Sequence, residues 1–229
     1  GDAVWSMYDY NRGCCDNICY SGVADIFRLP KFSLSFFRTQ IAEGSMLPSG
    51  KMPYEVFIPA YRDEILSETV MVYGNVDEVE LVLNGKTIRR QTADKGPDSD
   101  YIPVPNGGNG KNLHFPPFTF YGVPKERGVL KAVGYHQGKK VAEYTVKTPG
   151  VPERLDITYF ESGKPATKND LLIVYVRMLD KQGVLCPVNG IPVELSVQGG
   201  EIVGPTSYPL EAGVASFLVR TGEISKINI

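Results

Sequence analysis

Apolar and polar residues alternate along much of the chain between residues 51 and 149, and this period of two predicts β-strands. Within this stretch, Val79, Leu81 and Leu83 fall on one face of a strand and Glu80 falls on the other. Asn84-Gly85 then leads into a second alternating segment, which predicts a two-residue hairpin because both residues tolerate positive φ. With about seven strands, this part is typical of an Ig-like β-sandwich. The strands are expected at 54–58, 69–73, 79–83, directly after Asn84-Gly85, and at 115–120, 129–135 and 141–146, with a further turn at Gln137-Gly138.

The alternation restarts after Pro149-Gly150-Val151-Pro152 and predicts a second Ig-like sandwich over residues 150–229. Residues 171–176 are apolar on both faces, which indicates a buried strand. The next strand is expected to hold Val193, Leu195 and Val197, followed by Gly199-Gly200. The sequence stops within the strand-like run 224–229. Because an Ig-like domain needs a further strand, we expect this second sandwich to be truncated.

Residues 1–50 follow a different pattern, which predicts a strand, a loop and a helix. The strand is expected at residues 3–8, and a polar loop with several cysteines at residues 12–21. Apolar residues then recur at helical spacing after Pro30, whose missing N–H costs little near a helix start. The apolar residues of this helix are Leu34, Phe36, Phe37 and Ile41. They need a partner surface, so we expect them to pack on the 51–149 sandwich or on a second copy of the chain, as a homodimer.

Composition narrows the possible functions of the chain. The 229 residues carry a net charge of −2 and are 42% hydrophobic, so packed cores are expected and a basic surface for nucleic acid is not. No apolar run approaches the roughly 20 residues that span a bilayer. The four cysteines lack the spacing of a zinc site, and a Cys15–Cys19 disulfide and reduced thiols both fit the sequence. Three aspartates in the Gly- and Pro-rich segment 92–112 lack the regular spacing of a calcium loop, so we expect neither metal nor cofactor.

Two stretches near the start carry a family resemblance. VWSMYDYNRG at residues 4–13, followed by SGVADIFRLPKFSLSFFRTQ at residues 21–40, resembles the last strand, loop and helix of the catalytic barrel in glycoside hydrolase family 2. This is the family of β-galactosidases and β-glucuronidases. The rest of the chain resembles the Ig-like modules that follow the barrel in its multi-domain members. The resemblance therefore implies a mainly β chain, in which 1–50 is the end of a (β/α)8 barrel, 51–149 is one Ig-like sandwich and 150–229 is a second.

The resemblance also implies what the chain does. Retaining glycosidases use two carboxyl groups about 5–5.5 Å apart. In this family they follow the fourth and seventh barrel strands, whereas this chain begins at a stretch like the eighth. No residue here inherits a catalytic role, so we expect a non-catalytic region of a retaining β-glycosidase that is inactive alone. Its substrate in the whole enzyme would be a carbohydrate, and its location the bacterial periplasm or exterior.

Four residues near the predicted strand end are candidates for sugar binding: Trp5, Asp9, Tyr10 and Asn11. The resemblance places Trp5 on the floor of the sugar site, and an indole face stacks well on the C–H face of a pyranose. Asp9 has two interpretations, which are direct sugar contact and a structural carboxylate that accepts hydrogen bonds from loop amides. Tyr8 and Arg12 are further residues that would line the same mouth.

A binding or adhesion protein is the alternative interpretation of the whole chain. Tandem Ig-like domains alone are also typical of carbohydrate-binding modules and cell-surface arrays, and fold does not determine function. The aromatic cluster at residues 115–121 would suit a sugar platform, a sandwich core or a seam between domains. The barrel-like stretch 1–41 favours the glycosidase, because an adhesin has no need of it.

Overall fold

The computed structural model describes residues 6–11, 13, 18–60, 68–94, 113–160 and 166–228. The chain divides into two compact units. Unit 1 comprises residues 1–25 and 30–148, and unit 2 comprises residues 26–29 and 149–229. The three-part division expected from the sequence, with 1–50 as a separate barrel end, stays a prediction.

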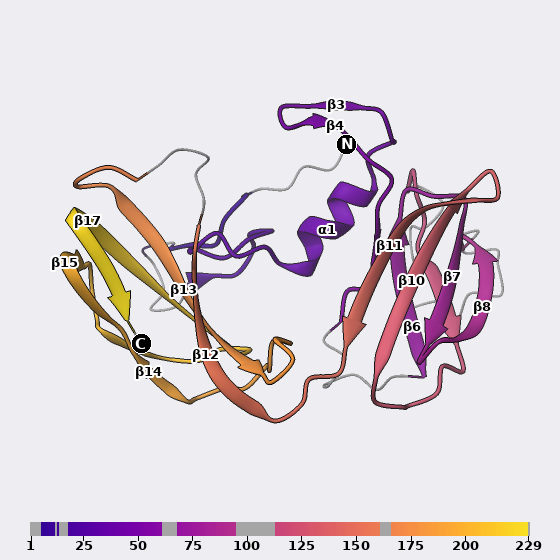
Figure 1. Cartoon of the computed structure of the whole chain (residues 1–229). Helices are drawn as coiled ribbons and strands as arrows, with labels where there is room; N and C mark the ends of the chain where they lie inside the picture. The colour runs from indigo at the N-terminus through magenta and orange to yellow at the C-terminus, as the bar shows by residue number, and fades with distance from the viewer. Residues whose placement is uncertain are drawn as a thin grey trace. The chain divides into compact units, whose positions relative to one another are not determined.

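Unit 1 contains a β-sandwich of two antiparallel sheets (Figure 1). One sheet has the order β11-β10-β7-β8 and the other the order β5-β6-β9. Their strands are β5 (Val56–Phe57), β6 (Thr69–Gly74), β7 (Glu78–Leu83), β8 (Lys86–Thr92), β9 (Phe118–Tyr121), β10 (Val129–His136) and β11 (Lys139–Lys147). These seven strands agree with the expected ones in position, and the fold is mainly β as predicted.

The alternation of apolar and polar residues determines the core of this sandwich, and the residues between the alternating segments determine its turns. Val79, Leu81 and Leu83 are buried in the core between the two sheets, as their alternation predicts. Both predicted hairpin turns are present, with positive φ at Asn84-Gly85 and at Gln137-Gly138. Phe118 and Phe120 are completely buried in the same core, so the sugar-platform interpretation is wrong for them.

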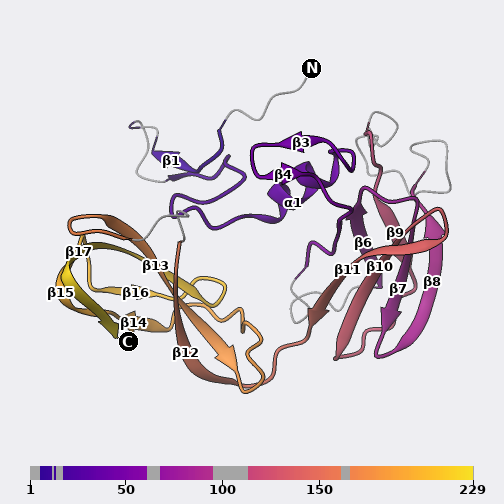
Figure 2. The same ribbon diagram turned by 45° about the horizontal axis from the view of Figure 1, so that its top comes forward.

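The N-terminal part of unit 1 holds two short antiparallel pairs and the one helix assigned in the described residues (Figure 2). The pairs are β1 (Tyr10–Asn11) with β2 (Ile18–Cys19), and β3 (Met46–Leu47) with β4 (Gly50–Lys51). The expected loop 12–21 therefore contains part of a strand, because the backbone at Ile18–Cys19 pairs with that at Tyr10–Asn11. Of the expected strand 3–8, residues 3–5 lie outside the described residues, and Tyr8 makes an isolated parallel bridge to Ala24.

Helix α1 (Phe32–Thr39) is shorter than its apolar pattern suggests. It ends before Ile41, because Gln40 forms the C-cap and its backbone N–H returns to the Phe37 carbonyl. The Gln40 side chain forms hydrogen bonds outside the helix, with the backbone of Phe115. Its Nε2 donates to the Phe115 carbonyl at 2.8 Å, and its Oε1 accepts from the Phe115 amide at 3.1 Å.

The helix packs on the sandwich of the same unit, which is one of the two partners expected for it. Phe36 meets Tyr73 of β6 edge to face, with ring centroids 5.1 Å apart, and Phe32 meets Phe57 of β5 at 5.8 Å. Arg38 pairs with Glu55, the residue before β5, and this contact raises the pKa of Arg38 through a hydrogen bond from its side chain. Dimerisation stays a prediction.

A single buried side chain fixes the segment between helix and sandwich. Asn75, which follows β6, is only 3% exposed. Its Nδ2 donates to the carbonyls of Ile41 at 3.0 Å and Pro53 at 2.9 Å, and its Oδ1 accepts from the Glu55 amide at 2.6 Å. Three of the four hydrogen bonds that an asparagine amide can make are thus used on one segment of backbone.

Unit 2 has a four-stranded sheet, β12-β13-β17-β15, and a two-stranded one, β14-β16. Its strands are β12 (Pro152–Tyr159), β13 (Leu171–Asp180), β14 (Pro192–Glu194), β15 (Ser196–Ile202), β16 (Ser207–Pro209) and β17 (Val214–Asn228). Val174, Phe217 and Val219 lie at the centre of its core. The short segment 26–29 belongs to this unit, where the Phe27 carbonyl accepts a hydrogen bond from the buried Tyr175 hydroxyl at 2.7 Å.

The structure corrects the expected strand 193–197. It is two strands that pair in different sheets, with β14 bonded to β16 and β15 bonded to β17. Leu195 lies between them and is buried in the core. Alternation alone cannot reveal such a change of sheet, because the apolar side chains keep facing the same core throughout. Gly199-Gly200 lies within β15, at a bulge, rather than after it.

Asp180 organises the turn at the end of β13. Its carboxylate accepts hydrogen bonds from the amides of Gly150 at 2.7 Å and of Gln182 and Val184 at 2.8 Å. These amides, that of Gly150 most, hold the pKa of Asp180 below its ordinary value of 3.8. The carboxylate thus ties the start of unit 2 at Gly150 to the β13 turn.

Replacing Asn75 by alanine should lower the free energy of unfolding of unit 1 by about 2–3 kcal/mol, because three buried backbone groups lose their partner. Urea unfolding followed by circular dichroism measures the change. The exposed Lys86→Ala serves as the control. An Asn75→Ala variant as stable as that control would contradict a structural role for the amide.

Replacing Asp180 by asparagine should destabilise unit 2 most at neutral pH. Because the folded-state pKa is lowered, the carboxylate contributes stability above pH 3.8, and this contribution is lost as the pH falls through the folded-state value. The stability difference between wild type and Asp180→Asn should therefore shrink as the pH is lowered from about 5 through the ordinary range of carboxyl pKa values. Guanidinium unfolding at a series of pH values tests this, with the exposed Glu153→Gln as control. A pH-independent difference would be inconsistent with it.

Candidate functional site

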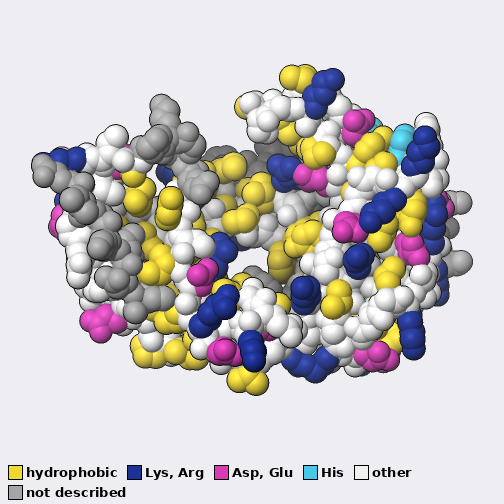
Figure 3. Space-filling model, viewed as in Figure 1, with side chains coloured by type: hydrophobic (Ala, Val, Ile, Leu, Met, Phe, Trp, Pro, Cys, Tyr) yellow, Lys and Arg dark blue, Asp and Glu magenta, His cyan; other side chains and the backbone are white. Residues whose placement is uncertain are grey.

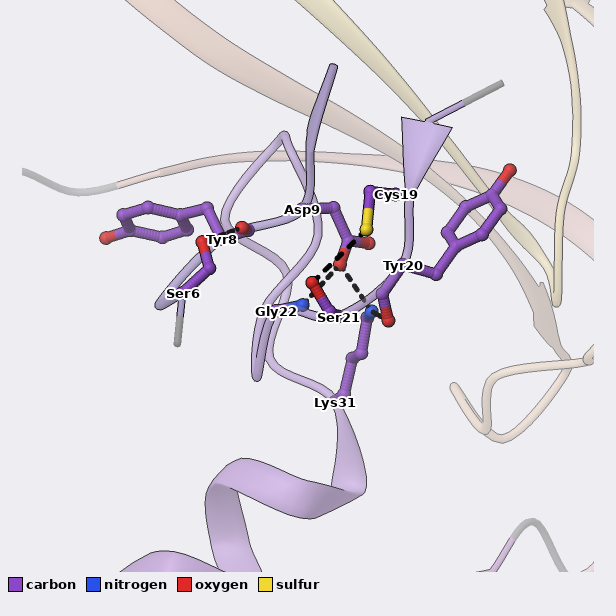
Figure 4. Close-up of polar contacts among 8 residues, drawn as sticks. All are labelled: Ser6, Tyr8, Asp9, Cys19, Tyr20, Ser21, Gly22 and Lys31. Carbon is purple, nitrogen blue, oxygen red and sulfur yellow. Dashed lines mark hydrogen bonds and ion pairs between the residues drawn. The ribbon is translucent and has the colours of Figure 1, made fainter. Parts of the chain in front are cut away.

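The candidate site lies where the first described strand residues meet the loop after β2 (Figure 4). The Asp9 amide donates to the Ala24 carbonyl, and the Ala24 amide donates to the Met7 carbonyl, both at 3.0 Å. These two bonds bring the strand end and the segment before the helix side by side. Figure 4 draws side chains from the strand end, from β2 and the loop after it, and from Lys31 at the start of α1.

Gly22 allows the two segments to approach so closely. A Cβ atom at this position would lie 2.3 Å from the Tyr8 carbonyl carbon and 2.4 Å from the Asp9 nitrogen. These are backbone atoms, which cannot move aside without breaking the bridge. Only glycine therefore fits this position in the present arrangement.

Asp9 forms an ion pair with Lys31. Its side chain is 3% exposed, and Oδ1 lies 2.7 Å from Lys31 Nζ. The same oxygen accepts a hydrogen bond from the Gly22 amide at 2.9 Å. Such charge-assisted bonds are stronger than neutral ones. Asp9 thus does what the structural interpretation expected, and direct contact with a sugar stays a prediction.

Lys31 connects three parts of this site. It is the N-cap residue of α1, yet its side chain does not cap the helix. Instead Nζ reaches back to Asp9 and to the Tyr20 carbonyl, at 3.2 Å, and lies 5.9 Å from the centre of the Tyr20 ring. Strand end, loop and helix start are therefore held by one ammonium group.

The other predicted site residues lie around this pair. Tyr10 and Asn11 form β1, and the Asn11 Oδ1 accepts a hydrogen bond from the Gly13 amide at 2.8 Å, which closes a local turn. Trp5 and Arg12 lie outside the described residues, so their predicted places in a sugar site stay predictions. The Tyr8 and Tyr20 rings project away from the Asp9–Lys31 pair in different directions (Figure 4).

This arrangement is suited to holding a loop rather than to proton transfer. The Asp9 carboxylate is paired with an ammonium group, whereas acid–base catalysis on a glycoside needs two cooperating carboxyl groups. Within the described ranges, no cluster of three or more His, Cys, Asp or Glu side chains could hold a metal ion. Asp94, one of the three aspartates considered for calcium, instead bonds the Thr119 amide and hydroxyl, at 3.2 and 2.6 Å.

The outer face of the unit 1 sandwich carries a second polar network, on β7, β8 and β10. Arg90 stacks on the Tyr135 ring at 3.7 Å and pairs with Glu78. The hydroxyl groups of Thr87 and Tyr135 both donate hydrogen bonds to Glu80. These bonds lower the pKa of Glu80, and the bond from Thr87 has the larger effect. Lys and Arg side chains stand among Asp and Glu over this unit in Figure 3. Because these groups satisfy one another, the face has the character of a solvated sheet surface.

Sequence reasoning missed Gly22, Lys31 and Tyr20. Gly22 lies in a stretch rich in small and polar residues, where a glycine forced by close backbone approach resembles any loop glycine. Lys31 is the only charged residue in the stretch from Leu29 to Phe37, and that isolation was the available indication. Its partner Asp9 is 22 residues away, a separation that no local pattern reveals.

Comparison with known proteins places these features in context. Residues 67–142 match the family model described as domain of unknown function DUF4982. A β-galactosidase of Thermoanaerobacter pseudethanolicus is 32% identical over 96% of this chain, which spans 30% of that relative. A β-galactosidase of Rhizobium radiobacter is 30% identical over 48% of this chain and 78% of the relative. A solved β-glucuronidase from glycoside hydrolase family 2 has a TM-score of 0.71, with 21% identity, over 92% of this chain and 21% of that structure.

These sequence relatives carry glycosidase names, and they define the family of the chain. It belongs to glycoside hydrolase family 2, and it matches the C-terminal part of the family's enzymes. The chain spans less than a third of the length of the first of these relatives. In the part of the chain that the structure describes, no helix is both long and apolar enough to cross a membrane.

Replacing Gly22 by alanine should separate the strand end from the segment 23–24, because the added Cβ meets backbone on both sides. Hydrogen exchange at the Asp9 and Ala24 amides should then accelerate by about tenfold or more, as local opening becomes easier. Gly13→Asn is the matched control, since nothing lies within 4 Å of a Cβ there and asparagine tolerates its positive φ. Unchanged protection in Gly22→Ala would show that the close approach is not maintained in solution.

Proposed function

We propose that this chain is the non-catalytic C-terminal region of a retaining β-glycosidase of the β-galactosidase type. In this proposal residues 1–50 are the end of the catalytic barrel, and 51–149 and 150–229 are Ig-like sandwiches. The first sandwich supports the barrel end and so maintains the substrate cleft. The substrate of the whole enzyme is a carbohydrate, and the enzyme acts in the periplasm or outside the cell.

The attachment of α1 to the first sandwich is the observation that carries this proposal. Aromatic contacts, the Arg38–Glu55 pair and the Asn75 amide all act between residues 32–55 and the strands β5 and β6. A flexible tether between independent modules would not need such contacts. They support a sandwich whose task is to hold the helix, and with it the strand end at Asp9, in one position.

The β-galactosidases among the relatives support the substrate class. Because Asp9 is paired with Lys31, its carboxyl group is not suited to act as acid or nucleophile. The two catalytic carboxyl groups would come from another part of the enzyme. The isolated chain should therefore show no hydrolysis of nitrophenyl β-galactoside.

A chimeric enzyme tests the proposal. The part of the Thermoanaerobacter pseudethanolicus β-galactosidase that matches this chain is replaced by residues 1–229. The chimera should hydrolyse nitrophenyl β-galactoside with a kcat/KM within roughly a hundredfold of the parent, because the catalytic groups are retained and the support is replaced. The parent enzyme without this region should be inactive.

Variants of the chimera test whether the first sandwich supports α1 or is merely attached to it. Asn75→Ala should shorten the half-life of activity on heating, since the helix loses its buried clamp, whereas Lys86→Ala should not. A chimera that folds and assembles but lacks activity, while the parent is active, would refute the proposal. Activity that is indifferent to the Asn75 change would refute the supporting role of the sandwich.

A further inference from the structure

At its centre, strand β13 of unit 2 is buried on both faces, as its apolar residues predict. Val174 and Val176 belong to the core of unit 2, so Tyr175 between them lies on the opposite face of the sheet. Tyr175 is nevertheless only 4% exposed. The hydroxyl group of Thr158, its cross-strand neighbour on β12, is buried as well. The core on the other face does not account for this burial, so a further part of the chain must cover the outer face here.

Segment 26–29 supplies part of this cover. It belongs to unit 2, and its Phe27 carbonyl accepts the hydrogen bond from the Tyr175 hydroxyl at 2.7 Å. The neighbouring Arg28 guanidinium lies 5.3 Å from the centre of the ring of Phe160, the residue after β12. A hydroxyl group on a buried ring is fixed in place, so the backbone carbonyl that it bonds is fixed as well. The outer face of β13 therefore holds this segment by its backbone.

The two ends of the segment are closed by contacts within unit 1. Ala24 forms an antiparallel bridge with Pro30, and the Lys31 amide donates to the Val23 carbonyl at 2.9 Å. Residues 25–29 thus form a short loop whose base is joined by backbone contacts. The base residues belong to unit 1, whereas the tip of the loop belongs to unit 2.

The base of this loop is also part of the candidate site. The Ala24 carbonyl accepts the hydrogen bond from the Asp9 amide, and Lys31 forms the ion pair with Asp9. At the tip, Arg28 has a φ of 66°, which is unfavourable for a residue with a side chain and persists only where surrounding contacts impose it. Because the loop is short and strained, a change in the contact at its tip is expected to reach its base.

We propose that Tyr175 is a positioning residue of the candidate site, which it holds through segment 26–29. Unit 2 thereby contributes to the position of Asp9, although Asp9 itself belongs to unit 1. This role extends the proposed function, in which only the first sandwich supports the barrel end. It does not depend on the activity of the whole enzyme, because every contact that carries it lies within this chain.

Native-state hydrogen exchange of the full chain, followed by nuclear magnetic resonance, tests this role. Tyr175→Phe keeps the ring on β13 and removes the hydroxyl group that donates to the Phe27 carbonyl. Exchange at the Asp9 and Ala24 amides should accelerate by about threefold to tenfold, which corresponds to the loss of one hydrogen bond. The Asn84 amide, which bonds the backbone within the first sandwich, should exchange as in wild type. A purely structural role of Tyr175 in unit 2 would not change exchange at Asp9.

Tyr208→Phe is the matched control. Tyr208 lies on β16 of the same unit and packs against Phe217, so this variant removes a hydroxyl group from the core side of unit 2. Exchange at the Asp9 and Ala24 amides should then be as in wild type. Equal acceleration in Tyr175→Phe and Tyr208→Phe would indicate a general loosening of unit 2 and would overturn the assignment of Tyr175.

The reverse measurement needs no change in unit 2. Coupling between two sites is reciprocal, so opening the base of the loop should loosen the hydrogen bond at its tip. Gly22→Ala should therefore accelerate exchange of the Tyr175 hydroxyl proton, whereas Gly13→Asn should not.

Two results would overturn the role of Tyr175. One is a Tyr175→Phe variant with wild-type exchange at the Asp9 and Ala24 amides, and the other is a Tyr175 hydroxyl proton that is indifferent to Gly22→Ala. The chimeric enzyme can be active in either case, because its activity tests the substrate class and the support from the first sandwich. An inactive chimera together with faster exchange at Asp9 in Tyr175→Phe would refute the proposed function and leave the role of Tyr175 in place.

Discussion

The buried amide of Asn75 is the interaction on which the rest of unit 1 depends. It joins the end of β6 to the backbone at Ile41, Pro53 and Glu55, and so fixes both ends of the segment between helix and sandwich. An apolar side chain of the same size would leave three backbone groups without partners in a site that water barely reaches. The amide is therefore a geometric constraint as well as a source of stability, because its bonds are satisfied only when the segment takes this one path.

That constraint extends from the sandwich to the candidate site through the helix. Gln40 at the helix end is bonded to Phe115, and Arg38 two residues earlier is paired with Glu55, so α1 cannot slide along the sheet without breaking polar contacts. The opposite end of the helix begins after Lys31, whose ammonium group binds Asp9 and Tyr20. A helix of eight residues is too short to be stable alone. Its position, and hence that of the loop, follows from tertiary contacts.

The sequence predicts the sandwich of unit 1 well and the site poorly, for physical reasons. Strands such as β7 are encoded by local alternation, and the Asn84-Gly85 turn by the positive φ that its residues tolerate. The contacts at the site join residues far apart in sequence, such as Gln40 with Phe115, and no periodicity records them. The prediction of a single strand at 193–197 was wrong for a related reason. The partner strands, and not the apolar pattern, decide that β14 and β15 belong to different sheets.

Lys31 connects the local sequence of the helix start with the long-range contacts of the site. A helix start favours a side chain that accepts hydrogen bonds from its free amides, and lysine cannot do so. The chain has Lys31 at the N-cap of α1 nonetheless, and the side chain serves the loop instead. A residue that breaks a local rule without a local gain indicates a requirement elsewhere. Here the requirement is the neutralisation of buried Asp9 at the strand end, so the start of the helix is adapted to the site rather than to the helix.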